Sequence, residues 1–101
     1  MRRVVLTGLG FQSSLALGRE ATWAAVLEGR DGLGPLTRLD LPQEPAQMAG
    51  QMALEAPRGR TRCEAAARLA LEEALEGWLP SGPSRRRGVF LGAGTTGIPL
   101  A

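Results

Sequence analysis

The stretch Arg3-Val-Val-Leu-Thr-Gly-Leu-Gly10 decides the fold class of this 101-residue chain. Val4, Val5 and Leu6 form an unbroken apolar run with two β-branched residues, and glycines end the run. A short continuous apolar run bounded by glycine is typical of a strand that is buried on both faces, as in a parallel sheet. We therefore expect residues 4–6 to form a buried strand of an α/β protein.

A second run of the same kind lies near the other end of the sequence. Residues 88–91 are Gly-Val-Phe-Leu, and the glycine-rich segment Gly92-Ala-Gly-Thr-Thr-Gly97 follows. Helical patterns occupy the chain between the two runs, which predicts an α/β fold with parallel-sheet strands and packing helices. Two strands do not make a complete sheet with covered faces. We therefore interpret residues 1–101 as one incomplete domain.

The first helix is predicted over residues 20–28. Trp23, Val26 and Leu27 recur at helical spacing, and Gly29 is a suitable stop. We expect Trp23 to anchor this helix in a core. Residues 30–59 are rich in glycine and proline, so we predict irregular structure there, with one short strand over residues 48–52.

A longer helix is predicted over residues 61–78. Thr61 followed by Glu64 resembles a capping box, and the proline at position 80 follows the end of the pattern. Many alanines on the apolar face predict close packing against another element, and we expect Trp78 to be buried. The apolar face comprises Cys63, Ala66, Ala67, Ala70, Leu71, Ala74, Leu75 and Trp78.

The two glycine-rich turns raise the alternative of a nucleotide site. Gly8-Leu-Gly-Phe-Gln-Ser13 nearly matches the G-x-G-x-x-G pattern, and residues 92–97 match it in full. Asp31 lies at about the expected distance from the first turn, but no strand leads to it. We favour glycines that allow tight turns and close packing, and we expect no cofactor. Binding of NAD or ATP is the competing interpretation.

Few other residues suggest chemistry. Cys63 is the single cysteine and the chain has no histidine, so we expect neither a disulfide nor a metal site, and we interpret Cys63 as a small buried apolar residue. Arg85, Arg86 and Arg87 form the one basic run, which is shorter than typical nucleic-acid patches. We interpret this run as a solvated loop and expect no nucleic-acid partner.

The first apolar run is too short for a signal peptide or a membrane span. A cytoplasmic location, without a membrane partner, is the expectation.

Taken in order, these segments resemble the β-ketoacyl-acyl carrier protein synthases. Residues 3–10 are similar to that family's basic residue followed by V-V-[IV]-T-G-[LIM]-G, and residues 13–20 to its S-P-L-G-x-G-x-E. Residues 23–40 and the pair Ala49-Gly50 resemble its next two segments. Residues 61–78 resemble its R-x-x-x-x-A-x-x-A-x-x-E-A-L helix, and residues 88–94 its G-V-x-x-G-[ST]-G strand end. The departures are Ser14, Ala16, Leu39 and Thr96, which indicate a divergent member.

The resemblance implies a thiolase-like fold, of which this chain is the N-terminal part of the first half. It implies a homodimer that condenses malonyl-acyl carrier protein with an acyl thioester, with loss of carbon dioxide. Family members use a later cysteine and two later histidines for this chemistry, and none of the three is in this chain. We therefore expect no catalytic residue here, and no activity from the chain alone.

One site residue is implied by the resemblance. The residue after the G-[ST]-G turn helps to shape the acyl-chain pocket in the family, and that position is Thr95. The competing function is a small non-catalytic interaction module that pairs with a full-length condensing enzyme. The sequence leaves open fatty acid synthesis, polyketide synthesis and a chain-length partner.

Overall fold

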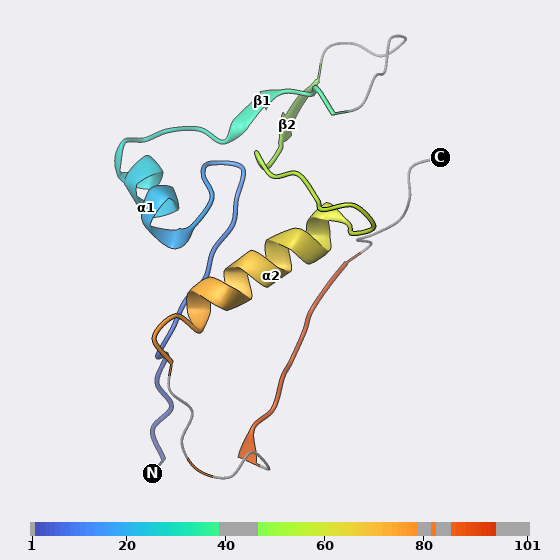
Figure 1. The fold of residues 1–101 in the computed structure, drawn as a ribbon. Coiled ribbons are helices and arrows are strands. Elements are labelled where there is room, and N and C mark those ends of the chain that lie inside the picture. The colour runs from blue at the N-terminus through green and yellow to red at the C-terminus, as the bar shows by residue number, and fades with distance from the viewer. Residues whose placement is uncertain (1, 39–46, 79–81, 83–85, 95–101) are drawn as a thin grey trace.

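The structure is a computed structural model that describes residues 2–38, 47–78, 82 and 86–94. Its elements are α1 (Arg19–Leu27), β1 (Leu33–Pro35), β2 (Met48–Gly50) and α2 (Arg62–Ala74), as Figure 1 shows. Both predicted helices and the short strand at Met48 are confirmed. The strand β1 was not predicted, because its sequence, Leu-Gly-Pro, carries no strand pattern.

The helix ends follow local capping chemistry. Thr61 has extended backbone angles, and its hydroxyl accepts a hydrogen bond from the Glu64 N–H at 3.1 Å. This bond is one half of the expected capping box. Gly29, with a φ of 72°, follows α1 as predicted. The helix α2 ends at Ala74, four residues before Trp78, and Gly77 with a φ of 74° turns the chain away.

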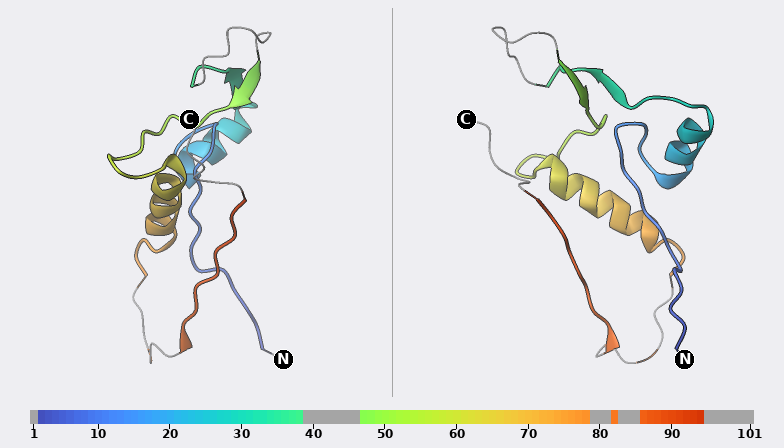
Figure 2. Two further views of the ribbon diagram at one scale, coloured as in Figure 1. Left: turned by 90° about the vertical axis from the view of Figure 1, so that its right-hand side faces the viewer. Right: turned by 180° about the vertical axis from the view of Figure 1, so that it is seen from behind.

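The expected parallel sheet is not confirmed. In the described part of the chain the named strands are β1 and β2, which pair antiparallel in the register Leu33↔Gly50 and Pro35↔Met48. The predicted strands at residues 4–6 and 88–91 form no ladder and no backbone hydrogen bond within the described chain. Both are nevertheless extended. They run in the same direction and lie on one side of α2, which runs the opposite way (Figures 1 and 2).

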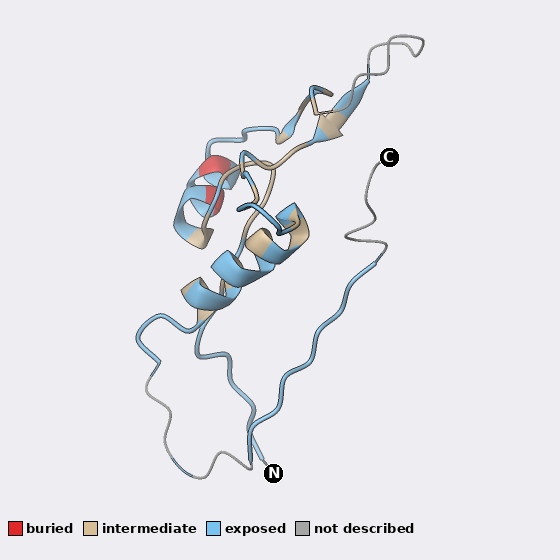
Figure 3. Cartoon of the chain, turned by 45° about the vertical axis from the view of Figure 1, so that its right-hand side comes forward, coloured by how far each residue is buried: buried red, intermediate tan, exposed pale blue. Residues whose placement is uncertain are grey.

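Very little of the described chain is buried. Ala25 and Thr22, both on α1, are the buried residues within it, and Figure 3 shows them as the red patch. The prediction that Trp23 and Trp78 anchor a core is wrong, since their exposed fractions are 61% and 48%. The N-terminal segment meets α2 at Ala70 and Ala74, but most large apolar side chains of the two helices stay exposed in the described chain.

The dimensions agree with this open arrangement. The radius of gyration is 17.3 Å, whereas a compact domain of this length has about 13 Å. The accessible surface is 9069 Å², whereas a folded monomer of 10.7 kDa exposes about 5,500 Å². The described elements are therefore a helical layer with strands attached, rather than a closed two-layer domain.

Candidate functional site

The N-terminal segment meets α2 at two glycines. A Cβ atom on Gly8 would lie 1.9 Å from the Ala74 carbonyl oxygen, and one on Gly10 would lie 1.7 Å from the Ala70 carbonyl oxygen. Ala70 and Ala74 are four residues apart, so they share one face of the helix. Backbone therefore packs directly on backbone, which confirms the close packing predicted from the alanines. Here the first glycine-rich turn serves packing.

A carboxylate on α2 holds the beginning of α1. The N-cap residue of α1 is Gly18, which has no side chain to accept the free N–H groups of the first turn. Glu73 takes this role from the other helix. Its carboxylate accepts the Arg19 N–H at 3.0 Å on each oxygen and the Phe11 N–H at 2.9 Å. Glu73 thus caps one helix while belonging to another.

These bonds change the acidity of Glu73. The backbone hydrogen bonds from Phe11 and Arg19 lower the pKa of this carboxyl below its ordinary value of 4.5, and the Arg19 charge adds to the effect. Desolvation raises the pKa and is weaker than the two backbone hydrogen bonds, so the pKa stays lowered. Glu73 is therefore ionised at neutral pH, as a helix cap requires.

We call Glu73, Arg19 and the bonds that they make the Glu73–Arg19 clamp, which the guanidinium of Arg19 completes. The Nη1 atom of this guanidinium donates to the carbonyl oxygens of Leu9 and Glu73, each at 3.0 Å. Its Nη2 lies 3.4 Å from a carboxylate oxygen of Glu76. The clamp thereby ties the N-terminal segment, α1 and α2 together. Sequence reasoning missed Glu73, although a glycine at the N-cap of α1 signalled that a cap had to come from elsewhere.

The Ser13 side chain, at the end of the first glycine turn, is engaged by the residues that follow it in the chain. The Ser13 hydroxyl accepts the Leu15 N–H at 3.2 Å and contacts the Ala16 carbonyl oxygen at 3.2 Å. The buried Thr22 hydroxyl donates to the same Ala16 oxygen at 3.2 Å. Ser13 stands at the last position of the G-x-G-x-x-G-like pattern. Its bonds brace the turn against α1, and this arrangement supports the packing interpretation over a phosphate cradle.

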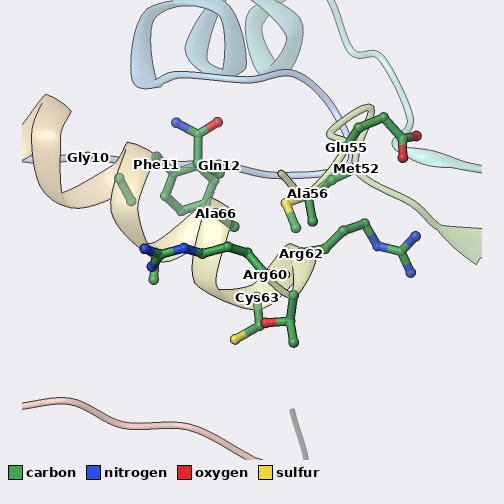
Figure 4. A pocket seen from close by; sticks show the side chains of 13 residues that line it. Gly10, Phe11, Gln12, Met52, Glu55, Ala56, Arg60, Arg62, Cys63 and Ala66 are labelled. Atoms are coloured by element: carbon green, nitrogen blue, oxygen red, sulfur yellow. The ribbon is translucent and has the colours of Figure 1, made fainter. Parts of the chain in front are cut away.

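A groove of about 970 Å³ lies between residues 10–12, residues 52–56 and the first turns of α2. Figure 4 shows Phe11 above the helix, with Met52 and Ala56 beside it and Cys63 on the helix itself. Cys63 is half-buried, so it lines an open groove rather than a core. The chain has no histidine to activate this thiol, and the described residues hold no cluster of metal-ligating side chains.

Thr95 and Arg85 lie outside the described residues. Gly92 and Gly94, which precede Thr95, are exposed, and a Cβ atom on either would meet nothing within 4 Å. Arg86 is exposed. Arg87 lies over the ring of Trp78 at 5.6 Å and donates to the Gly82 carbonyl oxygen. Of the two described arginines of the basic run, Arg87 is therefore engaged with its own loop and the residue Trp78, and Arg86 is exposed.

Comparison with known proteins decides the family. The sequence model of the β-ketoacyl synthase N-terminal domain matches residues 1–98. The chain belongs to this family. Its residues correspond to the N-terminal part of a β-ketoacyl synthase, which confirms the resemblance stated above. No solved structure gives a significant match.

Relatives of this β-ketoacyl synthase domain carry two kinds of name. The 3-oxoacyl-[acyl-carrier-protein] synthase 2 of Coxiella burnetii is 33% identical over 97% of this chain and 27% of its own length. A Streptomyces coelicolor protein named as an actinorhodin polyketide β-ketoacyl synthase 2 is 49% identical over 48% of this chain and 12% of its own length. The chain thus spans at most about a quarter of the curated relatives cited here.

The family's helix pattern now has a structural reason. Arg62, Ala67, Ala70 and Glu73 stand at the four named positions of R-x-x-x-x-A-x-x-A-x-x-E. Ala70 receives Gly10, and Glu73 closes the clamp. In this β-ketoacyl synthase domain the pattern therefore describes a packing face.

In the described part of the chain, no helix is long and apolar enough to cross a membrane.

Proposed function

We propose that the protein carrying these residues is a 3-oxoacyl-[acyl-carrier-protein] synthase. The observation that carries the proposal is the family match over residues 1–98, together with the Coxiella burnetii relative that aligns with 97% of the chain. The substrates would be malonyl-acyl carrier protein and an acyl thioester. The protein would act as a homodimer in the cytoplasm, in fatty acid or polyketide synthesis.

The proposed reaction joins two thioesters. A cysteine thiolate takes the acyl group and releases the first carrier thiol. The malonyl unit then loses carbon dioxide, and its enolate carbon attacks the acyl carbonyl. The thiolate leaves again, and the product is a 3-oxoacyl thioester on the second carrier. This chain has no histidine to activate a thiol, so we propose that the chain alone is inactive.

The role proposed for these residues is architectural. The two glycine contacts and the Glu73–Arg19 clamp fix the direction in which residues 3–9 leave α2. We propose that a segment so placed supports a site built by later residues. The described residues therefore contribute position rather than chemistry.

Thr95 is the one substrate-contacting residue in the proposal. A polar, β-branched side chain at this position would shorten the acyl pocket or make it more polar. Replacing Thr95 by glycine in the whole protein should shift the preference toward longer acyl chains, measured as kcat/KM for a series of acyl thioesters. An unchanged preference would remove Thr95 from the pocket.

The activity is tested on two samples. One is the purified 101-residue chain, and the other is the product captured from its source organism with an antibody against residues 61–78. We expect no 3-oxoacyl product from the first sample. From the second we expect condensation by a species of roughly four times 10.7 kDa, given the 27% share of the Coxiella burnetii relative.

The control is the same capture from a strain that lacks the gene. A captured species of 10.7 kDa without condensation would instead favour the interaction module, whose partner would then have the exposed apolar residues 4–6 and 89–91 to contact.

A further inference from the structure

The β1–β2 hairpin and the residues after it are held together as one unit. The Gln51 side chain accepts the Arg38 N–H at 3.0 Å, from the other half of the hairpin. The Arg38 guanidinium donates to the Met52 carbonyl oxygen at 2.7 Å, beyond the end of β2. These bonds join the hairpin to the residues that follow it, and we call residues 32–38 and 47–55 the hairpin arm.

The hairpin arm has few attachments to its surroundings. Among the described residues, no hydrogen bond joins it to α1, to α2 or to the N-terminal segment. A glycine with positive φ stands in each of its two connections (Figure 1): Gly29, at 72°, follows α1, and Gly59, at 81°, precedes α2. A Cβ atom on either glycine would meet nothing within 4 Å. Both connections therefore have the conformational freedom and the space of hinges.

One residue outside the hairpin arm lies against both halves of it. A Cβ atom on Gly32 would lie 2.5 Å from the Ser14 Oγ atom, and one on Gly50 would lie 3.1 Å from the same atom. Gly50 pairs with Leu33, the residue after Gly32, so the two glycines are neighbours across the hairpin. Ser14 therefore lies between them, in a space that a larger side chain on the hairpin would fill.

The hairpin arm also forms one wall of the 970 Å³ groove. Met52 and Glu55 line the groove from the arm, and Phe11 lines it from the N-terminal segment (Figure 4). Because Arg38 holds both Met52 and Glu55, a movement of the hairpin away from Ser14 would carry this wall with it.

We propose that the hairpin arm is a hinged wall that controls access to the groove, and that its contact with Ser14 sets the width of the groove. This inference goes beyond the proposed function and does not depend on it, because it rests on the contacts of the arm alone.

The single cysteine of the chain reports the opening of the groove. Cys63 lines the groove from α2, so a bulky maleimide should alkylate it faster when the wall moves away. On the purified 101-residue chain we expect Gly32→Ala to raise this rate about tenfold and Gly50→Ala about threefold, since overpacking at the shorter distance costs more. Gly34→Ala is the matched control on the same strand. Its Cβ atom would meet nothing within 4 Å, so the rate should stay unchanged.

A second substitution tests whether Ser14 is the contact that matters. Ser14→Ala removes the Oγ atom, so it should return the rate of Gly50→Ala almost to that of the unaltered chain. The circular dichroism of α1 and α2 should persist in every variant, because none of the substituted residues lies in a helix. Should Gly32→Ala alone lose this signal, the pair of Gly50→Ala with and without Ser14→Ala decides.

Three results would overturn the inference. The first is an equal alkylation rate in all these chains, and the second is an effect of Gly34→Ala as large as that of Gly50→Ala. The third is an unaltered chain without a helical signal, since the arrangement on which the inference rests would then be absent.

Discussion

At the scale of single residues, Gly10 is the described glycine at which an added Cβ atom would meet the nearest neighbour. A methyl group there would lie 1.7 Å from the Ala70 carbonyl oxygen, which is backbone and has little room to move. Gly10→Ala should therefore weaken the contact by about 1–3 kcal/mol. Amide hydrogen exchange at Phe11 reports the local opening directly.

The matched control for this substitution is Gly34→Ala. A Cβ atom at Gly34 would meet nothing within 4 Å, so the exchange rate of the Phe11 amide should stay unchanged. Equal effects of the two substitutions would contradict the close contact between Gly10 and α2.

Glu73 gives a second prediction at this scale, which concerns pH. Its pKa is lowered in the folded chain, so the clamp is fully formed above the ordinary value of 4.5 and is lost as the pH falls through the lower, folded value. The amide proton shifts of Phe11 and Arg19 should therefore titrate together below pH 4.5, as NMR would show. Glu73→Gln should abolish this titration and Glu72→Gln should not. A titration that survived Glu73→Gln would disprove the cap.

The sequence predicts some of these residues and misses others, for a physical reason. Gly8, Gly10 and the alanines of α2 were predicted to pack closely because small side chains on an apolar face have few other uses. Glu73 looked like its exposed neighbour Glu72, since helical spacing does not show which carboxylate meets another element. Only the three-dimensional arrangement of Phe11 and Arg19 shows it.

At the scale of elements, the helix α2 depends on its cap. The Thr61 hydroxyl accepts the Glu64 N–H, and α2 has no buried residue of its own to stabilise it. Thr61→Ala should cost about 1 kcal/mol and lower the helical signal in circular dichroism. Thr61→Ser keeps the hydroxyl and should retain most of the signal. Equal losses for both variants would mean that packing, and not the cap, sets the start of α2.

Helices were easier to predict than strands, and the reason is again physical. The backbone hydrogen bonds of α1 and α2 lie within each helix. The spacing of apolar residues and the capping residues therefore suffice to locate each helix to within a few residues. A strand is defined by its partner. Residues 4–6 carry the pattern of a buried strand, yet within the described chain they find no partner. The pair β1–β2 forms despite weak patterns, helped by Gln51, whose side chain bonds the Thr37 and Arg38 N–H groups.

At the scale of the whole molecule, the accessible surface area and the radius of gyration both indicate that the described elements do not enclose a core. The radius of gyration is 17.3 Å, and one apolar residue among those described is buried. The hydrophobic effect therefore contributes little to the stability of this arrangement. The family membership offers the missing context, because the chain corresponds to an N-terminal part that spans 27% of its Coxiella burnetii relative. The two predicted strands at residues 4–6 and 88–91 remain extended and exposed in the described chain, and the parallel sheet stays a prediction.

The central proposal is that residues 3–9 and 88–94, which form no strand pair within the described part of this chain, are paired in the whole protein. Amide hydrogen exchange with mass spectrometry, on the purified chain and on the antibody-captured product, tests the claim most directly. We predict free exchange in both segments of the isolated chain, and exchange slowed roughly a hundredfold or more in the captured product. Protection already present in the isolated chain, or absent from both samples, would contradict the account.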